Sequence, residues 1–156
     1  MKVIKLLFLL SLFVGTQDLS AQNLRLAFVL GGDEAQYDAL RTDYARTLLT
    51  VCKNDQETAL THWFKLLQDL EMYGEKINFD LDGTKLFLNI FWNEDGSIGH
   101  IGILPMPSSK NVLKEDLVAF FSSFVRQYSG AKLESDKKYS HYTTVSFPTF
   151  ARKANG

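Results

Sequence analysis

The histidines are the residues best suited to bind a transition metal or to transfer protons near neutral pH, and the chain has three of them. The spacing of His62, His100 and His141 matches no zinc signature. His100 and His141 lie in two predicted strands and could meet across a sheet, but two ligands without a third do not make a catalytic zinc site. We therefore expect surface or core histidines, and neither a metal nor another cofactor.

Ser140, His141 and Asp136 are the residue types of a hydrolytic triad. Adjacent residues of a strand point to opposite faces, however, and no nucleophile elbow surrounds Ser140. The single cysteine, Cys52, has no better support as a nucleophile with His62. We expect Cys52 to be a small buried residue, with intermolecular pairing or thiol chemistry as the alternative.

Oxygen ligands suited to calcium occur near the middle of the chain. Asn78, Asp80, Asp82 and Gly83 have the spacing of the first half of a calcium loop. The position that needs a bidentate carboxylate is Asn89, and a predicted strand rather than a helix follows. A turn that leads into this strand explains the string more simply, so we expect no calcium site.

The string Gly31-Gly32-Asp33-Glu34 is similar to the signature of bacterial cyclic-dinucleotide synthases. In those enzymes the signature belongs to a large cytoplasmic domain, with much more chain ahead of it. A coincidental match is therefore the better interpretation. Asp33 is available as the N-cap of the helix that follows. The chain thus contains no recognisable catalytic motif, and we expect a protein that is not an enzyme.

The N-terminus has the pattern of a secretory signal. Lys2 and Lys5 form a positive region, Leu6–Val14 is an apolar run interrupted only by Ser11, and Leu19–Ala21 is suited to cleavage. The apolar run is shorter than the roughly 20 residues that span a bilayer, so we expect cleavage and no stable membrane insertion. The expected location is the periplasm or the outside of the cell.

Residues 22–156, which would remain after cleavage of residues 1–21, are enough for one domain with a core of its own. The whole chain has 17 Lys and Arg against 18 Asp and Glu. This balance gives no attraction to nucleic acid or to anionic lipid. No repeat or Pro/Gly-rich linker divides the mature part, so we expect a single domain.

Helical patterns dominate the first half of the mature part. Residues 24–30 alternate like a short strand, and apolar residues then recur at helical spacing from Tyr37 to Val51. Asn54 begins a second helical pattern that we expect to end at Gly74. The short link between these patterns predicts an antiparallel helix pair, with an apolar side for a sheet to cover.

Strand patterns dominate the second half. Residues 85–92 and 98–104 are predicted strands, joined by a hairpin turn at Asp95-Gly96. Apolar spacing predicts a helix over residues 113–128, and residues 139–147 form a last predicted strand. The aromatic residues on these regular apolar faces are best explained as core, namely Trp63, Trp92, Phe120, Phe121 and Phe124.

The order of these elements resembles the C-terminal domain of the TonB energy-transducing proteins over residues 83–150. The shared pattern is a strand with a glycine turn over residues 86–96, a strand over 98–104, a helix over 114–128 and a closing strand that ends at Phe150. Lys85 stands where the family has an apolar residue, and the upstream Tyr-Pro is missing. The sequence has no Pro-rich spacer either, so we expect a stand-alone exported relative that transmits no energy.

The resemblance implies peptide or protein binding, because the last strand of the family offers an edge to which a partner segment adds. The matching stretch here is residues 140–147, and the candidate edge residues are Tyr142, Thr144 and Ser146 on one face. The other face would carry His141, Thr143, Val145 and Phe147. In the alternative interpretation this strand is covered and serves only the core.

The sequence thus predicts an α+β domain, in which a helix pair precedes a TonB-like β-β-α-β unit with an antiparallel sheet. The expected function is non-catalytic binding of an envelope protein or peptide. The alternatives are a small-ligand pocket or an unfamiliar enzyme site between the helices and the sheet, and a purely structural role in an assembly. A deep pocket with converging polar groups would favour a small ligand, whereas an exposed strand edge beside an apolar patch would favour protein binding.

Overall fold

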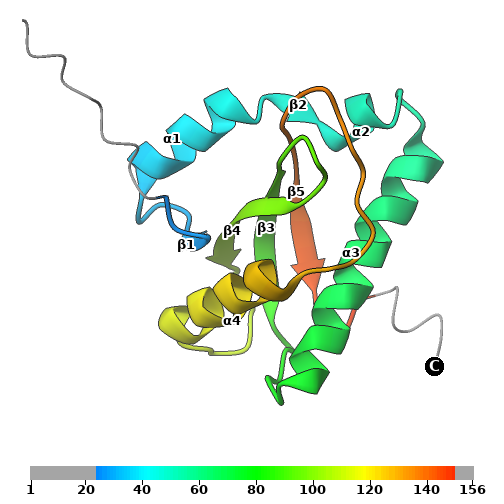
Figure 1. Cartoon of the computed structure of the whole chain (residues 1–156). Helices are drawn as coiled ribbons and strands as arrows, with labels where there is room; N and C mark the ends of the chain where they lie inside the picture. The colour runs from blue at the N-terminus through cyan, green and yellow to red at the C-terminus, as the bar shows by residue number, and fades with distance from the viewer. Residues whose placement is uncertain (1–23, 150–156) are drawn as a thin grey trace, which may run out of the picture.

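The computed structural model describes residues 24–149, in which helices cover a five-stranded mixed sheet (Figure 1). The predicted export signal lies outside the described residues. The elements in chain order are β1 (Ala27–Val29), α1 (Glu34–Asp43), β2 (Arg46–Thr47), α2 (Leu48–Val51), α3 (Gln56–Lys76), β3 (Lys85–Trp92), β4 (Ile98–Pro105), α4 (Lys114–Gln127) and β5 (Tyr139–Ser146). The protein is therefore α+β, as predicted.

The strands follow the order β1-β4-β3-β5-β2, so β3 is the central strand. It pairs antiparallel with both β4 and β5 over long registers. The outer strands β1 and β2 are short, and each runs parallel to its neighbour. The sheet is thus mixed, whereas the sequence predicted an antiparallel one, because two short N-terminal segments add to the edges of the three long strands.

The main core lies between one face of the sheet and helices α3 and α4. Leu86, Leu88, Ile90 and Trp92 alternate along β3 and are fully buried on this face. Figure 1 shows α4 in front of the strands and α3 along the β5 side of the sheet. The residues that the sequence predicted as aromatic core are all buried here, namely Trp63, Trp92, Phe120, Phe121 and Phe124.

A smaller core lies on the opposite face of the sheet. Leu40 and Tyr44 pack there against Phe28 and Phe91. The rings of Tyr44 and Phe91 meet edge to face, with centroids 5.4 Å apart. Because α1 covers this face and α3 the other, the two helices do not form the predicted antiparallel pair.

The predicted helix over residues 37–51 is interrupted in the structure. α1 ends before Tyr44, whose carbonyl accepts a hydrogen bond from the Ser140 hydroxyl at 3.1 Å. The chain then runs beside β5 as β2, and the Thr47 side chain caps the new helix α2. Apolar spacing alone could not predict this break, since a partner distant in the sequence stabilises it.

The helix α3 also differs from its predicted ends. Asp55 rather than Asn54 is the N-cap, and its carboxylate accepts from the backbone N–H groups of Glu57 and Thr58. Gly74 lies inside the helix rather than at its end. A Cβ at this position would lie 3.0 Å from the carbonyl oxygen of Phe79, so the glycine permits close packing of the loop that follows.

The turn between β3 and β4 was predicted correctly. Gly96 has a φ of +76°, which glycine adopts readily. The backbone N–H of Asn93 donates to the Ser97 carbonyl at 2.9 Å, and the Asp95 carboxylate accepts from the Ser97 N–H. The hairpin therefore fixes the register of the central strands.

The segment after β5 is attached to α3 by a buried carboxylate. Glu71 accepts two hydrogen bonds of 2.7 Å, from the backbone N–H and the hydroxyl of Thr149. Both residues are buried, with 5% and 4% of their surface exposed.

Among the described residues, no helix has the length and apolar character needed to cross a bilayer.

We predict that Glu71→Ala lowers the free energy of unfolding by about 2–4 kcal/mol, because it leaves two buried donors of Thr149 without an acceptor. Urea denaturation followed by tryptophan fluorescence would measure the change. Met72→Ala is the control: this neighbour is 58% exposed, and its removal should change the free energy by less than about 0.5 kcal/mol. Equal effects of the two substitutions would contradict the proposed role of Glu71.

Candidate functional site

The outer side of β5 is paired over only part of its length. β2 lies beside Tyr139 and Ser140 and then turns into α2. Within residues 24–149, no strand pairs with the outer side of Tyr142–Ser146. The sheet thus has an open position next to β5, which we call the β5 slot.

The hydrogen-bond pattern tells which backbone groups face the slot. The N–H of Phe147 donates to the Thr84 carbonyl, and the Phe147 carbonyl accepts from Gly83, so both groups of Phe147 point toward β3. In an antiparallel pair, successive residues of a strand direct these groups to opposite sides. The backbone groups of Thr143 and Val145 therefore form hydrogen bonds with β3. The backbone groups of the three candidate residues point into the slot instead, namely those of Tyr142, Thr144 and Ser146.

The side chains of β5 alternate between the two faces of the sheet. His141 and Val145 lie on the α3 face, where the His141 ring meets Trp63 with centroids 4.7 Å apart. Tyr142 lies on the opposite face, where its ring is 5.6 Å from that of Phe87. Tyr142, Thr144 and Ser146 are exposed.

A groove of about 390 Å³ separates β5 from α3 and opens along the slot. The strand side consists of residues 141 and 143–146, with Thr149 at the end. The helix contributes four apolar side chains, from Leu60, Trp63, Phe64 and Leu67. Leu60 is 51% exposed and Phe64 43% exposed, so an apolar rim borders the open edge.

No Asp, Glu, Lys or Arg is among the described residues that line this groove. Among these described residues, the only ionisable side chain is that of His141, and burial lowers the pKa of this histidine below its ordinary value of 6.5. The imidazole is therefore neutral at pH 7. The groove thus offers backbone hydrogen bonds along one side and uncharged, largely apolar side chains along the other.

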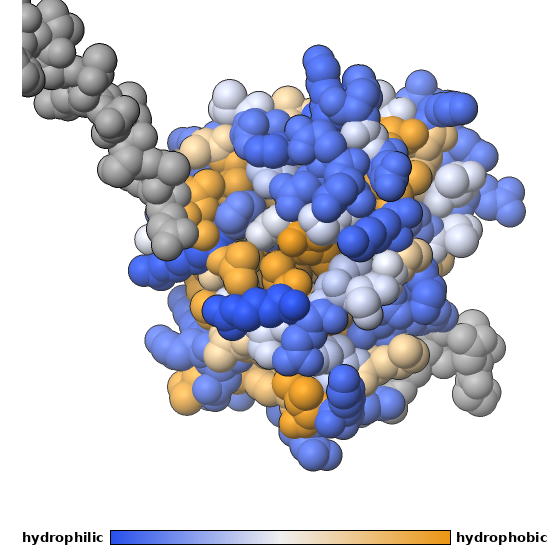
Figure 2. All heavy atoms as spheres, in the orientation of Figure 1, coloured by the Kyte–Doolittle hydropathy of each residue, from blue (hydrophilic) through white to orange (hydrophobic). Residues whose placement is uncertain are grey.

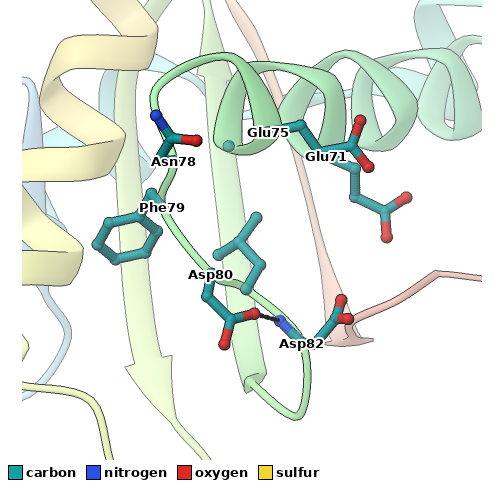
Figure 3. A pocket seen from close by; sticks show the side chains of 8 residues that line it. Glu71, Glu75, Asn78, Phe79, Asp80 and Asp82 are labelled. Atoms are coloured by element: carbon teal, nitrogen blue, oxygen red, sulfur yellow. Dashed lines mark hydrogen bonds between the residues drawn. The ribbon is translucent and has the colours of Figure 1, made fainter.

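A second groove, at the C-terminal end of α3, contains several carboxylates (Figure 3). Figure 3 shows Glu71 and Glu75 on the helix, and Asp80 and Asp82 on the loop, with carboxylates that do not converge on one point. Asp80 accepts from the N–H of Asp82 and pairs with Lys110, whose hydrogen bond lowers the pKa of Asp80. Within residues 24–149, no group of three or more His, Cys, Asp or Glu is arranged to hold a metal ion.

A third groove lies between β1 and α4, with apolar residues such as Phe28 and Val118 in its lining. Figure 2 shows hydrophobic surface near the middle of this view, with hydrophilic residues around it. Charges of both signs line this groove too, from Arg25, Asp33, Lys114 and Glu115. These three grooves are open to solvent. The third borders the short edge strand β1, whereas the groove beside β5 follows the longer stretch Tyr142–Ser146, which has no outer partner among the described residues.

The three histidines do not form a site. His100 pairs with Phe91 on the α1 face, and its Nδ1 lies 2.8 Å from the Arg25 carbonyl oxygen. His141 lies on the α3 face instead. His62 lies near Trp92, with ring centroids 5.9 Å apart. Burial lowers the pKa of all three, which is the behaviour of packed neutral rings.

The remaining candidate residues have structural partners. Asp136 forms an ion pair with Arg46, and the Ser140 hydroxyl donates to the Tyr44 carbonyl. Cys52 is a buried free thiol, as predicted. The carboxylate of Asp33 accepts from the N–H of Gln36, so the Gly31–Glu34 string ends in a helix cap.

Sequence reasoning missed the contribution of α3 to the groove. The apolar residues that predict this helix lie on its buried face. Leu60 and Phe64 lie outside that face. The sequence does contain a signal for this contribution. Leu60 and Phe64 are four positions apart, so they lie on one side of the helix, beside its buried stripe. They widen the apolar face of α3 beyond what β3 and α4 cover.

Comparisons of the chain with protein-family models, with curated proteins and with solved structures found no match.

We predict that proline is tolerated at position 144 and not at position 143. Thr143→Pro removes a hydrogen bond to the central strand and should lower the free energy of unfolding by at least about 2 kcal/mol. Thr144→Pro removes an N–H that points into the slot, so the loss should be less than about 1 kcal/mol. Urea denaturation of both variants would measure this difference, and a larger loss for Thr144→Pro would refute the assigned edge.

Proposed function

We propose that this protein is a non-catalytic binding domain of the cell envelope, which captures an extended segment of an envelope protein or peptide by adding it to β5. The observation that carries the proposal is the row of backbone groups at Tyr142, Thr144 and Ser146 that point into an open slot beside an apolar groove. An extended main chain is the ligand that satisfies alternating N–H and carbonyl groups.

The proposed location is the periplasm or the extracellular space, reached by removal of a signal peptide over residues 1–21. Lys2, Lys5 and the apolar run that follows support this location. We further propose that the second half of the domain is TonB-like. The order β3-β4-α4-β5 supports this idea, because it is the β-β-α-β order of that family.

The free edge is also a hazard, because unpaired backbone groups can join two copies of a chain. Natural proteins usually cover or shorten such an edge, or place charges on it. Residues 141–146 carry no Asp, Glu, Lys, Arg or Pro. Retention of an uncharged edge beside exposed Leu60 and Phe64 is what a binding function would require.

The binding proposal can be tested with a library of random peptides of about seven residues, displayed on phage and selected on the immobilised mature protein. Thr144→Pro should weaken the binding of selected peptides at least about tenfold, because it removes one hydrogen bond and places a ring in the slot. Thr144→Val is the matched control, since it keeps the backbone N–H and should retain binding. Equal affinity of the wild type and Thr144→Pro for the same peptides would contradict strand addition at this edge.

A further inference from the structure

The slot also determines which side chains of a bound segment meet the protein. Residues directly opposite each other in a sheet direct their side chains to the same face. Thr143 and Val145 direct theirs to the α3 face. Two residues of an added strand, opposite Thr143 and Val145, would therefore point toward the exposed rim of α3.

We infer that the partner segment carries apolar side chains at two alternate positions, which pack against Leu60 and Phe64 of α3. This inference rests on the proposed function and specifies its ligand: an extended segment with an apolar-x-apolar pattern. The inference specifies the sequence pattern of the bound segment and not the protein to which the segment belongs.

The chemistry of the groove requires uncharged residues at these two positions. The described side chains that line it include no cation or anion, and His141 is neutral at pH 7. A charged side chain would lose water there without gaining a partner, which is costly. An apolar side chain would instead remove the exposed surface of Leu60 and Phe64 from water.

The residue between the two apolar positions faces different surroundings. It lies opposite Thr144, so its side chain points to the other face of the sheet, on which Tyr142 is 61% exposed. No described helix closes that face over Thr144 and Ser146, both of which are exposed. The middle position can therefore be polar or charged.

The chain itself limits the length of the segment. At the start of β5, β2 occupies the slot beside Tyr139 and Ser140, and α2 follows directly. At the other end, Glu71 holds Thr149 in a buried position. The open stretch is Tyr142–Ser146, so the bound strand should be about five residues long.

The test uses the same peptide library on the full mature protein, with sequencing of the selected peptides. We expect apolar residues at two alternate positions and no preference at the position between them. Replacing either apolar residue of a selected peptide by aspartate should weaken binding at least about tenfold. Selected peptides that accept aspartate at both positions would overturn the inference.

A change of specificity gives an independent result. Phe64→Lys places a cation on the rim and should shift one of the two alternate positions toward Asp or Glu. Met72→Lys is the matched control, because it adds the same charge to an exposed part of α3 that does not line this groove. An unchanged peptide preference for Phe64→Lys would count against the assigned contact.

The outcomes separate the inference from the function on which it rests. If Thr144→Pro abolishes binding but the peptides show no alternating apolar pattern, strand addition holds and the inference fails. If no peptide binds the wild type better than Thr144→Pro, the proposed function fails first. A second copy of this chain in the slot would be detected as a dimer by sedimentation that Thr144→Pro dissociates, and this result would overturn the peptide as occupant.

Discussion

The structure depends on the central position of β3, which pairs with a neighbour along both edges. Its alternate residues from Leu86 to Trp92 are fully buried on the α3 face, and Phe91 is fully buried on the α1 face. A strand buried on both faces has one register, since a slip of one residue would exchange the two sets of side chains. This register aligns β5, and the direction of the β5 backbone groups follows from it.

Most of the regular elements could be predicted from the sequence because local patterns determine them. The strands β3 and β4, the turn at Gly96 and the helix α4 have strong periodicity or a glycine where a turn requires it. The break between α1 and α2 could not be predicted, because pairing of β2 with β5 stabilises it. The same holds for the mixed sheet, whose parallel pairs join residues far apart in the chain.

Only the β5 side of the candidate site was predictable from the sequence. Alternation along β5 identified Tyr142, Thr144 and Ser146 as one set, and the sheet gives their backbone groups an unpaired side. The α3 side of the groove was not predictable. The sequence does not tell that Leu60 and Phe64 face β5, because this depends on how α3 packs against the sheet. A groove between two elements is a property of packing, which single-sequence periodicity does not contain.

The short strand β2 has a consequence for the order in which the chain can fold. Arg46 pairs with Tyr139, and Ala27 pairs with Ile101, so both edges of the sheet join early residues to late ones. Contacts of such long sequence separation form slowly, since a long loop must close before they gain any stability. The sheet also remains without β5 until nearly the whole chain is available. A newly made chain can therefore complete its sheet only late in its synthesis, after the residues that form β5 have been added.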